Sequence, residues 1–302
     1  MRAHGRLVPI LLLVGAGAGI GSIFPLAKAA SLQGVPPLAF AFGLCFGAGL
    51  VLLAATLARG RRPPPLDLRH LRYYLLSGFL GIALPWTLVA LLVPRIGSGL
   101  PAVVQSLAPI LTLAIVLVLG YERPNGRRLA GLAIGMAGML IAVLARNEVS
   151  VGDAILWQVL ALVTPLSLAF GNVYRTADWP AGGDAVSLAA GSLFAAALFD
   201  ALALAGGAAA GLAAPPDAAA IVGALPLIGA QSLLAGFGYL FFFRLQQLTG
   251  PVFLSQVSYA NTTTGLVFAI FLFGEPLSPW LAPAVLLVFA GVWLVNRTQP
   301  AG

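Results

Sequence analysis

The sequence predicts an all-α membrane protein in which ten transmembrane helices form two inverted five-helix repeats around a central cavity. Three observations predict this fold. The composition requires lipid as solvent, apolar runs of spanning length recur ten times, and short motifs recur half a chain apart. Of the 302 residues, 60% are hydrophobic and only 8% are charged, with a mean hydropathy of +1.00. Soluble domains are about 25% charged, so this chain lacks the polar surface that water requires.

Five apolar runs fill the first half of the chain, each bounded by glycine, proline or charged residues. The first run follows Arg2 and Arg6 and resembles a signal peptide. It is longer than the apolar region of a signal peptide, however, so we predict that it is retained as a helix. The five predicted helices cover about 7–29, 36–58, 71–93, 98–120 and 127–145.

Five more apolar runs fill the second half, and the junction of the seventh and eighth is the least sharply bounded because residues 206–216 are rich in alanine and glycine. A count of nine or eleven helices would place the C-terminus on the opposite side. Each crossing takes about 20 residues, so ten crossings leave room only for loops and tails and exclude a separate extramembrane domain. These five predicted helices cover about 153–174, 185–206, 219–243, 251–274 and 279–296.

The basic residues support ten crossings, because arginine and lysine are held on the cytoplasmic side of a membrane. With ten helices, thirteen of the 16 basic residues fall on one side, and both termini are then cytoplasmic. The other side receives Lys28, Arg95 and Arg146. The thirteen are Arg2, Arg6, Arg59, Arg61, Arg62, Arg69, Arg72, Arg123, Arg127, Arg128, Arg175, Arg244 and Arg297.

A glutamate followed by a glycine in the next helix occurs once in each half. Glu122 precedes Gly138 by sixteen residues, and Glu275 precedes Gly291 by the same spacing. The two copies lie 153 residues apart, about half of the chain, which indicates a duplication. The two predicted repeats are residues 1–148 and 149–302.

A pair of prolines supports the duplication. Pro101 and Pro251 open equivalent helices at an offset of 150, which places Ser106 opposite Gln256. An odd number of helices per copy forces the second copy to enter the membrane from the opposite face. The repeat is therefore predicted to be inverted in topology.

These marks resemble the drug/metabolite transporter superfamily, specifically its EamA-type members with ten helices in two five-helix halves. The resemblance rests on Glu122 with Gly138, Glu275 with Gly291, and the segment 21–25, Gly-Ser-Ile-Phe-Pro, in the first helix. It implies amino-acid or metabolite efflux. The first helix lacks the membrane-embedded glutamate of the related small multidrug-resistance proteins, so export of cationic drugs by that proton-coupled mechanism is not expected.

The ninth predicted helix carries a polar stripe over residues 255–264, where only Val257 and Ala260 are apolar. Polar side chains in hydrocarbon need a partner or water, so this helix is predicted to face protein and a wet cavity. The alternative is that these groups only join helices, since serine and threonine can bond carbonyls of their own helix. The path-lining candidates are Gln256, Tyr259, Asn261 and Thr262.

Further polar and aromatic residues lie within other predicted helices. Amides donate and accept hydrogen bonds without charge, which suits a zwitterionic or polar uncharged solute. A purely structural role is an equal alternative for Gln105 and Gln231, and an interfacial position is an alternative to a wall of the path for Trp86. These additional candidates are Gln231, Gln105, Tyr239, Trp86 and Asn172.

Three charged residues near helix ends are gate candidates: Glu122, Glu275 and Lys28. Each has a structural alternative, since an acid favours the positive end of a helix and a lysine can anchor at the interface. Asp200 maps toward the outer end of its helix, so no carboxylate is expected near the centre of the membrane. Uniport, exchange and ion-coupled antiport therefore all remain open.

The sequence offers no apparatus for catalysis, so an enzyme is not expected. Both histidines, His4 and His70, lie in predicted cytosolic segments, and the single cysteine, Cys45, allows neither a disulfide nor a thiol metal site. No metal or cofactor is predicted. The basic residues sit in short loops without interleaved aromatics, which argues against nucleic acid despite the sequence pI near 10.3.

The predicted function is a secondary transporter of a small polar metabolite, an amino acid or similar, working by alternating access. Export is favoured only through the family resemblance. Uptake, or a receptor or scaffold that transports nothing, are the alternatives. We expect a monomer in the cytoplasmic membrane of a prokaryote, with the bilayer, a small solute and in some mechanisms a coupling ion as partners.

Overall fold

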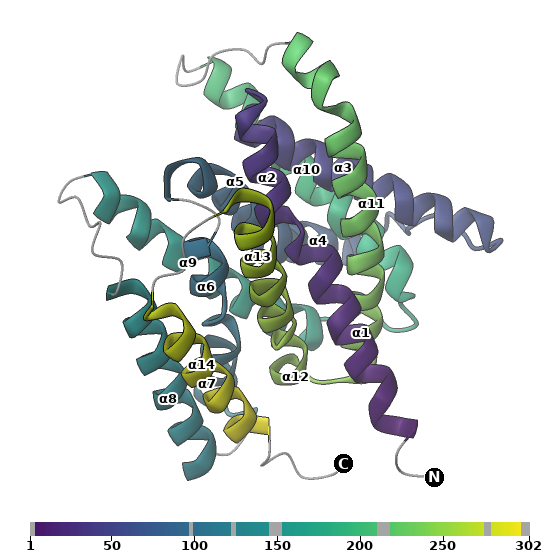
Figure 1. Cartoon of the computed structure of the whole chain (residues 1–302). Helices are drawn as coiled ribbons and strands as arrows, with labels where there is room; N and C mark the ends of the chain where they lie inside the picture. The colour runs from purple at the N-terminus through teal and green to yellow at the C-terminus, as the bar shows by residue number, and fades with distance from the viewer. Residues whose placement is uncertain are drawn as a thin grey trace.

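The computed structural model describes residues 4–96, 99–121, 125–144, 153–209, 218–274 and 279–296, and these residues form a bundle of helices without strands (Figure 1). The first half contains α1 (His4–Gly21), α2 (Ile23–Leu32), α3 (Pro37–Ala58), α4 (Leu68–Gly78), the π-helix η1 (Phe79–Ala83), α5 (Leu84–Ile96), α6 (Gly99–Gln105), α7 (Ala108–Val118) and α8 (Gly126–Leu144). The second half contains α9 (Asp153–Ala177), α10 (Ala185–Ala209), α11 (Ala218–Leu248), α12 (Pro251–Ser255), α13 (Val257–Phe273) and α14 (Leu281–Asn296).

Helix lies along each of the ten predicted ranges within the described residues, and four of these runs are interrupted. The breaks fall at Ser22, at the π-helix η1, at Ser106–Leu107 and at Gln256. Five runs are long and apolar enough by themselves to cross a membrane. They are Val8–Leu32, Pro37–Ala58, Leu68–Ile96, Ala185–Ala209 and Ala218–Leu248. The all-helical membrane class is thus confirmed, while ten crossings and the inverted repeat stay predictions.

Polar side chains cap several helices where the sequence leaves the apolar run. Asp67 precedes α4 and accepts hydrogen bonds from the backbone N–H groups of Arg69 and His70 at 3.1 and 3.2 Å. Asn125 caps α8 in the same way, accepting from the N–H of Arg127 at 3.0 Å. Because the first N–H groups of a helix have no partner within it, these caps fix where each helix begins.

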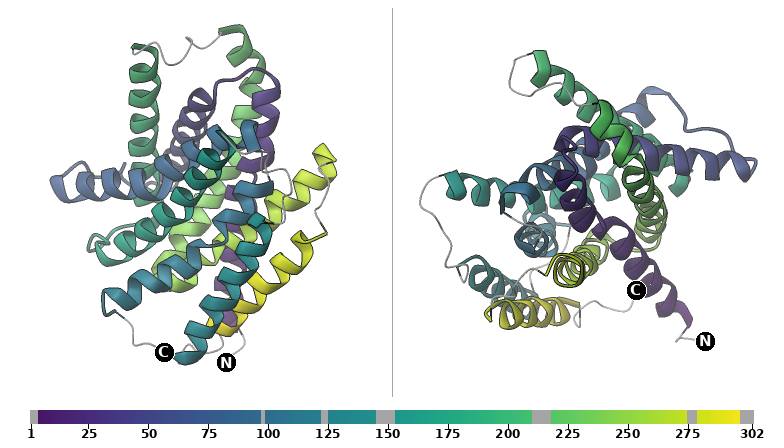
Figure 2. Two further views of the ribbon diagram at one scale, coloured as in Figure 1. Left: turned by 90° about the vertical axis from the view of Figure 1, so that its left-hand side faces the viewer. Right: turned by 45° about the horizontal axis from the view of Figure 1, so that its top comes forward.

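The helices pack in pairs that are far apart in the sequence. Helix α3 lies against α10, and α8 lies against α14 at one side of the bundle. Helix α1 passes between α11 and α13 and contacts both. The turned views show the same neighbours, with the α8–α14 pair set apart from the longer helices (Figure 2).

Glycines make these close approaches possible, because they let two helix backbones come together without a side chain between them. A β-carbon at Gly17 would collide with Ala260, and one at Gly19 would meet the backbone of Gly238 at 2.8 Å. Between α8 and α14, a β-carbon at Gly291 would stand 2.5 Å from the carbonyl oxygen of Gly131. These glycines therefore allow the backbones of neighbouring helices to pack closely.

Candidate solute pathway

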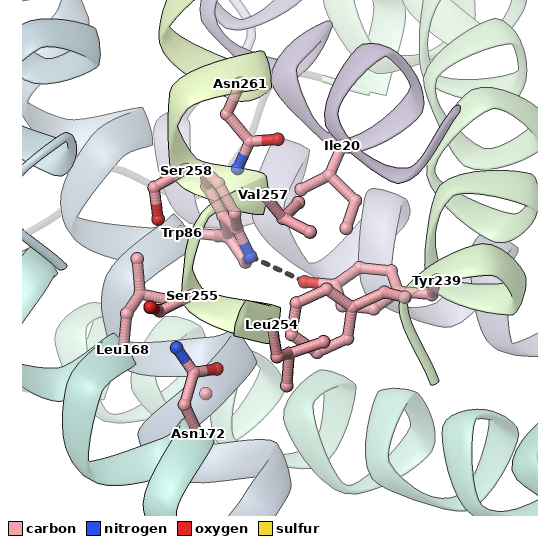
Figure 3. A pocket seen from close by; sticks show the side chains of 12 residues that line it. Ile20, Trp86, Leu168, Asn172, Tyr239, Leu254, Ser255, Val257, Ser258 and Asn261 are labelled. Atoms are coloured by element: carbon pink, nitrogen blue, oxygen red, sulfur yellow. Dashed lines mark hydrogen bonds between the residues drawn. The ribbon is translucent and has the colours of Figure 1, made fainter. Parts of the chain in front are cut away.

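A small pocket lies at the centre of the bundle, where residues from five predicted crossings meet (Figure 3). The volume that the centre of a water molecule can reach in this pocket is about 20 Å³. One water needs about 10–15 Å³ on that measure, so the pocket holds about one water and is too small for a metabolite. It is lined by Ile20, Gly81, Trp86, Leu168, Asn172, Tyr239, Phe242, Leu254, Ser255, Val257, Ser258 and Asn261.

The polar stripe of the ninth run is divided between the pocket and the packed interior. Ser255, Ser258 and Asn261, spaced three residues apart, line the pocket. Gln256, Tyr259 and Thr262 are buried but are not among its lining residues. Thr262 donates its hydroxyl to the carbonyl of Ser258 at 2.8 Å, which is the helix-bonding role expected as the alternative.

Trp86 and Tyr239 form one wall of the pocket and are joined by a hydrogen bond. The indole Nε1–H of Trp86 donates to the hydroxyl of Tyr239 at 2.6 Å. Phe24 contacts the indole edge-on, with ring centroids 6.1 Å apart. Only 2% of Trp86 is exposed, so it is part of the wall and does not lie at the protein surface, where an interfacial tryptophan would be.

The two glutamines outside the stripe are fully buried, and neither lines the pocket. Gln231 accepts a hydrogen bond at 3.0 Å from Ser22, the residue at the break between α1 and α2. Gln105 ends α6 just before the break at Ser106, and neither of its polar side-chain atoms has a hydrogen-bond partner among the described residues. Gln105 therefore lies at a break in its own run, whereas Gln231 lies within α11 and contacts a break in a neighbouring run.

Asn172 lines the pocket and contacts Arg175, which the sequence predicts to be one of the arginines on the cytoplasmic side. Arg175 lies in the last turn of α9 and is 0% exposed. Its Nη2 donates to Oδ1 of Asn172 at 2.7 Å, while its Nε and Nη1 have no acceptor among the described residues. The signal that could have identified it is geometric: helical side chains lean toward the N-terminus, so an arginine in the last turn of a helix points back along it.

The place for Arg175 is provided by the π-helix. A β-carbon at Gly81, in the middle of η1, would collide with Nη1, so the glycine leaves the space that the guanidinium occupies. The ring of Phe242 lies 5.0 Å from the guanidinium carbon and that of Phe243 lies 5.8 Å from it. Near η1, Ser167 of α9 donates to the carbonyl of Leu80 at 2.6 Å, which fixes the two helices against each other.

The surroundings only partly compensate the buried charge of Arg175. Removing an unpaired ion from water costs several kcal/mol even after the protein relaxes. A buried cation–π contact returns about 2 kcal/mol, and a cation at a helix C-terminus gains about 0.3–2 kcal/mol. No carboxylate contacts this guanidinium within the part of the chain that the structure describes. The charge of Arg175 is thus only partly compensated by the residues that the structure describes.

Asp200 is the second charged residue that is buried within the described part of the chain. The sequence places it toward the outer end of its helix, and its burial against neighbouring helices was not anticipated. It lies in α10 and is 2% exposed. The hydroxyl of Thr87 in α5 donates to its Oδ1, and the buried thiol of Cys45 in α3 lies beside it. The burial arises because α3 and α5 pack against α10 beside this residue.

Of the three gate candidates, only Lys28 is among the described residues. Its Nζ lies 4.5 Å above the ring of Phe273, so α2 contacts the end of α13 through this pair. Glu122 and Glu275 lie outside the described residues.

A small cluster closes the end of α9 that carries Arg175, just outside the apolar run. Arg72 donates from Nη2 to both carboxylate oxygens of Asp178 at 2.7 and 2.9 Å, and the hydroxyl of Tyr174 donates to Oδ2 at 2.7 Å. The bond from Tyr174 and the Arg72 cation hold the pKa of Asp178 below its ordinary value of 3.8. Asp178 is therefore fully committed to these partners and does not neutralise Arg175.

Comparison with known proteins agrees with the arrangement of helices. Residues 7–144 match the EamA-like transporter family. The chain is 33% identical over 269 residues to YedA of Escherichia coli strain K12, described as an uncharacterized inner membrane transporter, covering 85% of this chain and 81% of the relative. The YedA proteins of E. coli O6:H1 and O157:H7 match equally. The chain also superimposes on a solved structure titled "Crystal structure of protein", with a TM-score of 0.67 over 99% of this chain. The two sequences are 18% identical, so this likeness shows a shared fold.

Proposed function

The chain belongs to the EamA-like transporter family, and from that premise we propose that it carries a small polar metabolite across the cytoplasmic membrane by alternating access between two inverted halves, residues 1–148 and 149–302. The observation that carries the proposal is the position of the pocket. Its lining comes from both halves, with Ile20, Gly81 and Trp86 from the first and the other nine residues from the second. A site between two halves can open to either side as they tilt.

The pattern of helix contacts supports a two-fold relationship between the halves. Helix α1 packs against α11 and α13, and its counterpart α9 packs against α5 with η1 and against α6 with α7. In the pairs α3–α10 and α8–α14, a helix packs against its own counterpart in the other half. Such contacts are expected where a two-fold axis passes between the two helices. This exchange symmetry is what an inverted repeat would produce.

The helix breaks support the same relationship and indicate where the halves bend. Ser106 interrupts the fourth run and Gln256 interrupts the ninth, and these residues are opposite one another under the proline alignment. At the first break, the N–H of Leu107 donates to the carbonyl of Val104 at 3.1 Å. At the second break, the N–H of Gln256 donates to the carbonyl of Phe253 at 3.1 Å. Such tightened turns break the helix, and transporters place their sites at discontinuous helices.

The small pocket volume fits a carrier in a closed conformation. Because about one water fits, a solute binds only after the pocket walls separate, and closure around the empty site is a step of the alternating-access cycle of a uniporter. The hydroxyls of Ser255 and Ser258 and the amides of Asn172 and Asn261 supply neutral donors and acceptors for a polar solute. Gln256, Tyr259, Thr262, Gln231 and Gln105 are proposed to join this lining as the halves move.

We propose export as the direction, both termini in the cytoplasm, and Lys28, Glu122 and Glu275 as gate residues. Asp200 supplies a buried carboxylate near α3 and α5, so proton coupling is compatible with the proposal, alongside uniport and exchange.

The test is a comparison of metabolite release by cells with and without the protein, using two leucine substitutions on one helix. Ser258→Leu fills the pocket, whereas Thr263→Leu places the same side chain at an exposed position of α13. We expect the wild type and Thr263→Leu to alter the release of the same metabolites and Ser258→Leu to lose this effect at equal membrane abundance. Equal activity of both variants, or no altered metabolite with the wild type, would contradict the proposal.

A further inference from the structure

We propose that Arg175, which lies directly behind the lining of the central pocket, binds the carboxylate of the transported solute once the lining moves aside, an inference that rests on the proposed function. The established family membership assigns no residue to the solute, and the basic side chains counted on the predicted cytoplasmic side were expected to set orientation only. Among those whose side chains the structure describes, Arg175 differs because its side chain is completely buried next to the pocket.

The guanidinium is in contact with three residues that line the pocket. Nη2 bonds the amide oxygen of Asn172, Nη1 lies against the α-carbon of Gly81, and the ring of Phe242 covers the guanidinium carbon at 5.0 Å. A small movement of Gly81 or Asn172 would therefore open Arg175 to the pocket. Figure 3 shows Asn172 at one end of this space and Asn261 at the other.

The atoms without partners are complementary to a carboxylate and an amine. Nε and Nη1 of Arg175 have no acceptor among the described residues, and an arginine offers a planar fork that binds two carboxylate oxygens. At the opposite end, Oδ1 of Asn261 has no donor among those residues and can accept from an N–H or O–H group. The pocket thus offers donors at one end and an acceptor at the other.

The net charge of the site selects a carboxylate over a phosphate. Arg175 supplies one positive charge, and none of the twelve lining residues is charged. One carboxylate neutralises it, whereas a phosphate group carries about −1.5 to −2 charges at neutral pH and would leave buried negative charge. The remaining walls, with Trp86, Tyr239 and Leu254, suit the uncharged part of a small monocarboxylate, with or without an amino group.

The experiment uses purified full-length protein and measures thermal stabilisation by the common amino acids, by their α-carboxamides and by inorganic phosphate. We expect at least one free acid to raise the unfolding temperature of the wild type, with its carboxamide and phosphate at least tenfold weaker. Arg175→Gln should weaken binding of that acid at least tenfold and remove the preference over the carboxamide. Arg175→Lys should retain part of this preference for the acid, because the positive charge remains while the two-pronged guanidinium is lost.

Arg95→Gln is the matched control. Arg95 also stacks on an aromatic ring, with its guanidinium carbon 4.0 Å from the centroid of Trp157, but it is exposed and outside the pocket. Its substitution should leave binding unchanged. If Arg175→Gln binds the acid within twofold of the wild type, if phosphate or the carboxamide binds as well as the acid, or if none of these acids binds, the inference is wrong. The metabolite comparison with Ser258→Leu judges transport separately, so either proposal can fail while the other stands.

Discussion

Trp86 donates its indole N–H to the hydroxyl of Tyr239 across 2.6 Å, and the two residues are 153 positions apart in the chain. The same offset separates Glu122 from Glu275 and Gly138 from Gly291. In a two-fold repeat, equivalent positions touch each other only where the axis passes between them. The axis of the proposed repeat would therefore run beside this bond, and hence beside the pocket that both rings line.

Loss of the Tyr239 hydroxyl is expected to destabilise the fold. Tyr239→Phe would leave the buried N–H of Trp86 without an acceptor, at a cost of about 1–3 kcal/mol in the free energy of unfolding. Tyr73→Phe is the matched control, since Tyr73 is equally buried but its hydroxyl has no partner among the described residues. Thermal unfolding in detergent measures both. Equal effects of the two changes would mean that the Trp86–Tyr239 bond contributes no net stability.

Asn261 is expected to matter for transport more than for folding. Asn261→Ala removes a pocket-lining amide, and the loss of one hydrogen bond to the solute, about 1.4 kcal/mol, lowers affinity roughly tenfold. Thr263→Ala, two residues later on an exposed face of α13, should keep wild-type transport. Flux of the identified metabolite in reconstituted vesicles distinguishes them. An Asn261→Ala flux within twofold of the wild type would remove Asn261 from the path.

Two glycine-to-alanine changes should act in opposite directions. Gly291→Ala places a methyl group 2.5 Å from the carbonyl oxygen of Gly131, so α8 and α14 must separate, and we expect about 1–3 kcal/mol of destabilisation. At Gly229 a β-carbon meets nothing within 4 Å, so Gly229→Ala should stabilise α11 by about 0.5–1 kcal/mol. Unfolding temperatures give the two signs. A stabilised Gly291→Ala protein would disprove the close α8–α14 contact.

The Asp178 cluster predicts a stability change in acid. Because the native pKa of Asp178 is depressed below 3.8, its ionised form stabilises the fold at neutral pH, and this contribution disappears as the pH falls from about 3.8 through the lower native value. Asp178→Asn should therefore unfold at a slightly lower temperature than the wild type at pH 6, and the gap should narrow progressively as the pH falls below about 3.8. A gap that stays constant with pH would show that ionisation of Asp178 is not involved.

The helices could be predicted from the sequence because apolar runs and their glycine, proline and charged boundaries are local features. The breaks at Ser22 and Gln256 were not predicted. The break at Ser22 has a local cause in Pro25, which has no N–H to bond the carbonyl of Gly21, whereas no proline follows Gln256 within its run and only the structure reveals that bend. The polar stripe lies on the run that contributes Ser255, Ser258 and Asn261 to the pocket. The choice between Asn261, which lines the pocket, and Thr262, which bonds its own helix, depends on how α13 is rotated against α1 and α9.

The two buried charges were missed for a related reason. Arg175 ends an apolar run and therefore looks like a loop residue, but α9 continues to Ala177 and the side chain leans back into the bundle. Asp200 was assigned to the outer interface from its position along the helix, yet α3 and Thr87 cover it. Depth along a helix can be estimated from the sequence, whereas the covered face depends on neighbours that are distant in the chain.

The π-helix between α4 and α5 has a consequence for evolutionary change. A π-turn is an α-helix with one inserted residue, so Phe79–Ala83 rotates everything after it by about 100° relative to an unbroken α-helix. Deleting a single residue there would restore regular winding and swing the indole of Trp86 away from Tyr239. Hydropathy and span length would hardly change, so homologues with such a deletion could look alike in sequence and still present a different wall to their cargo.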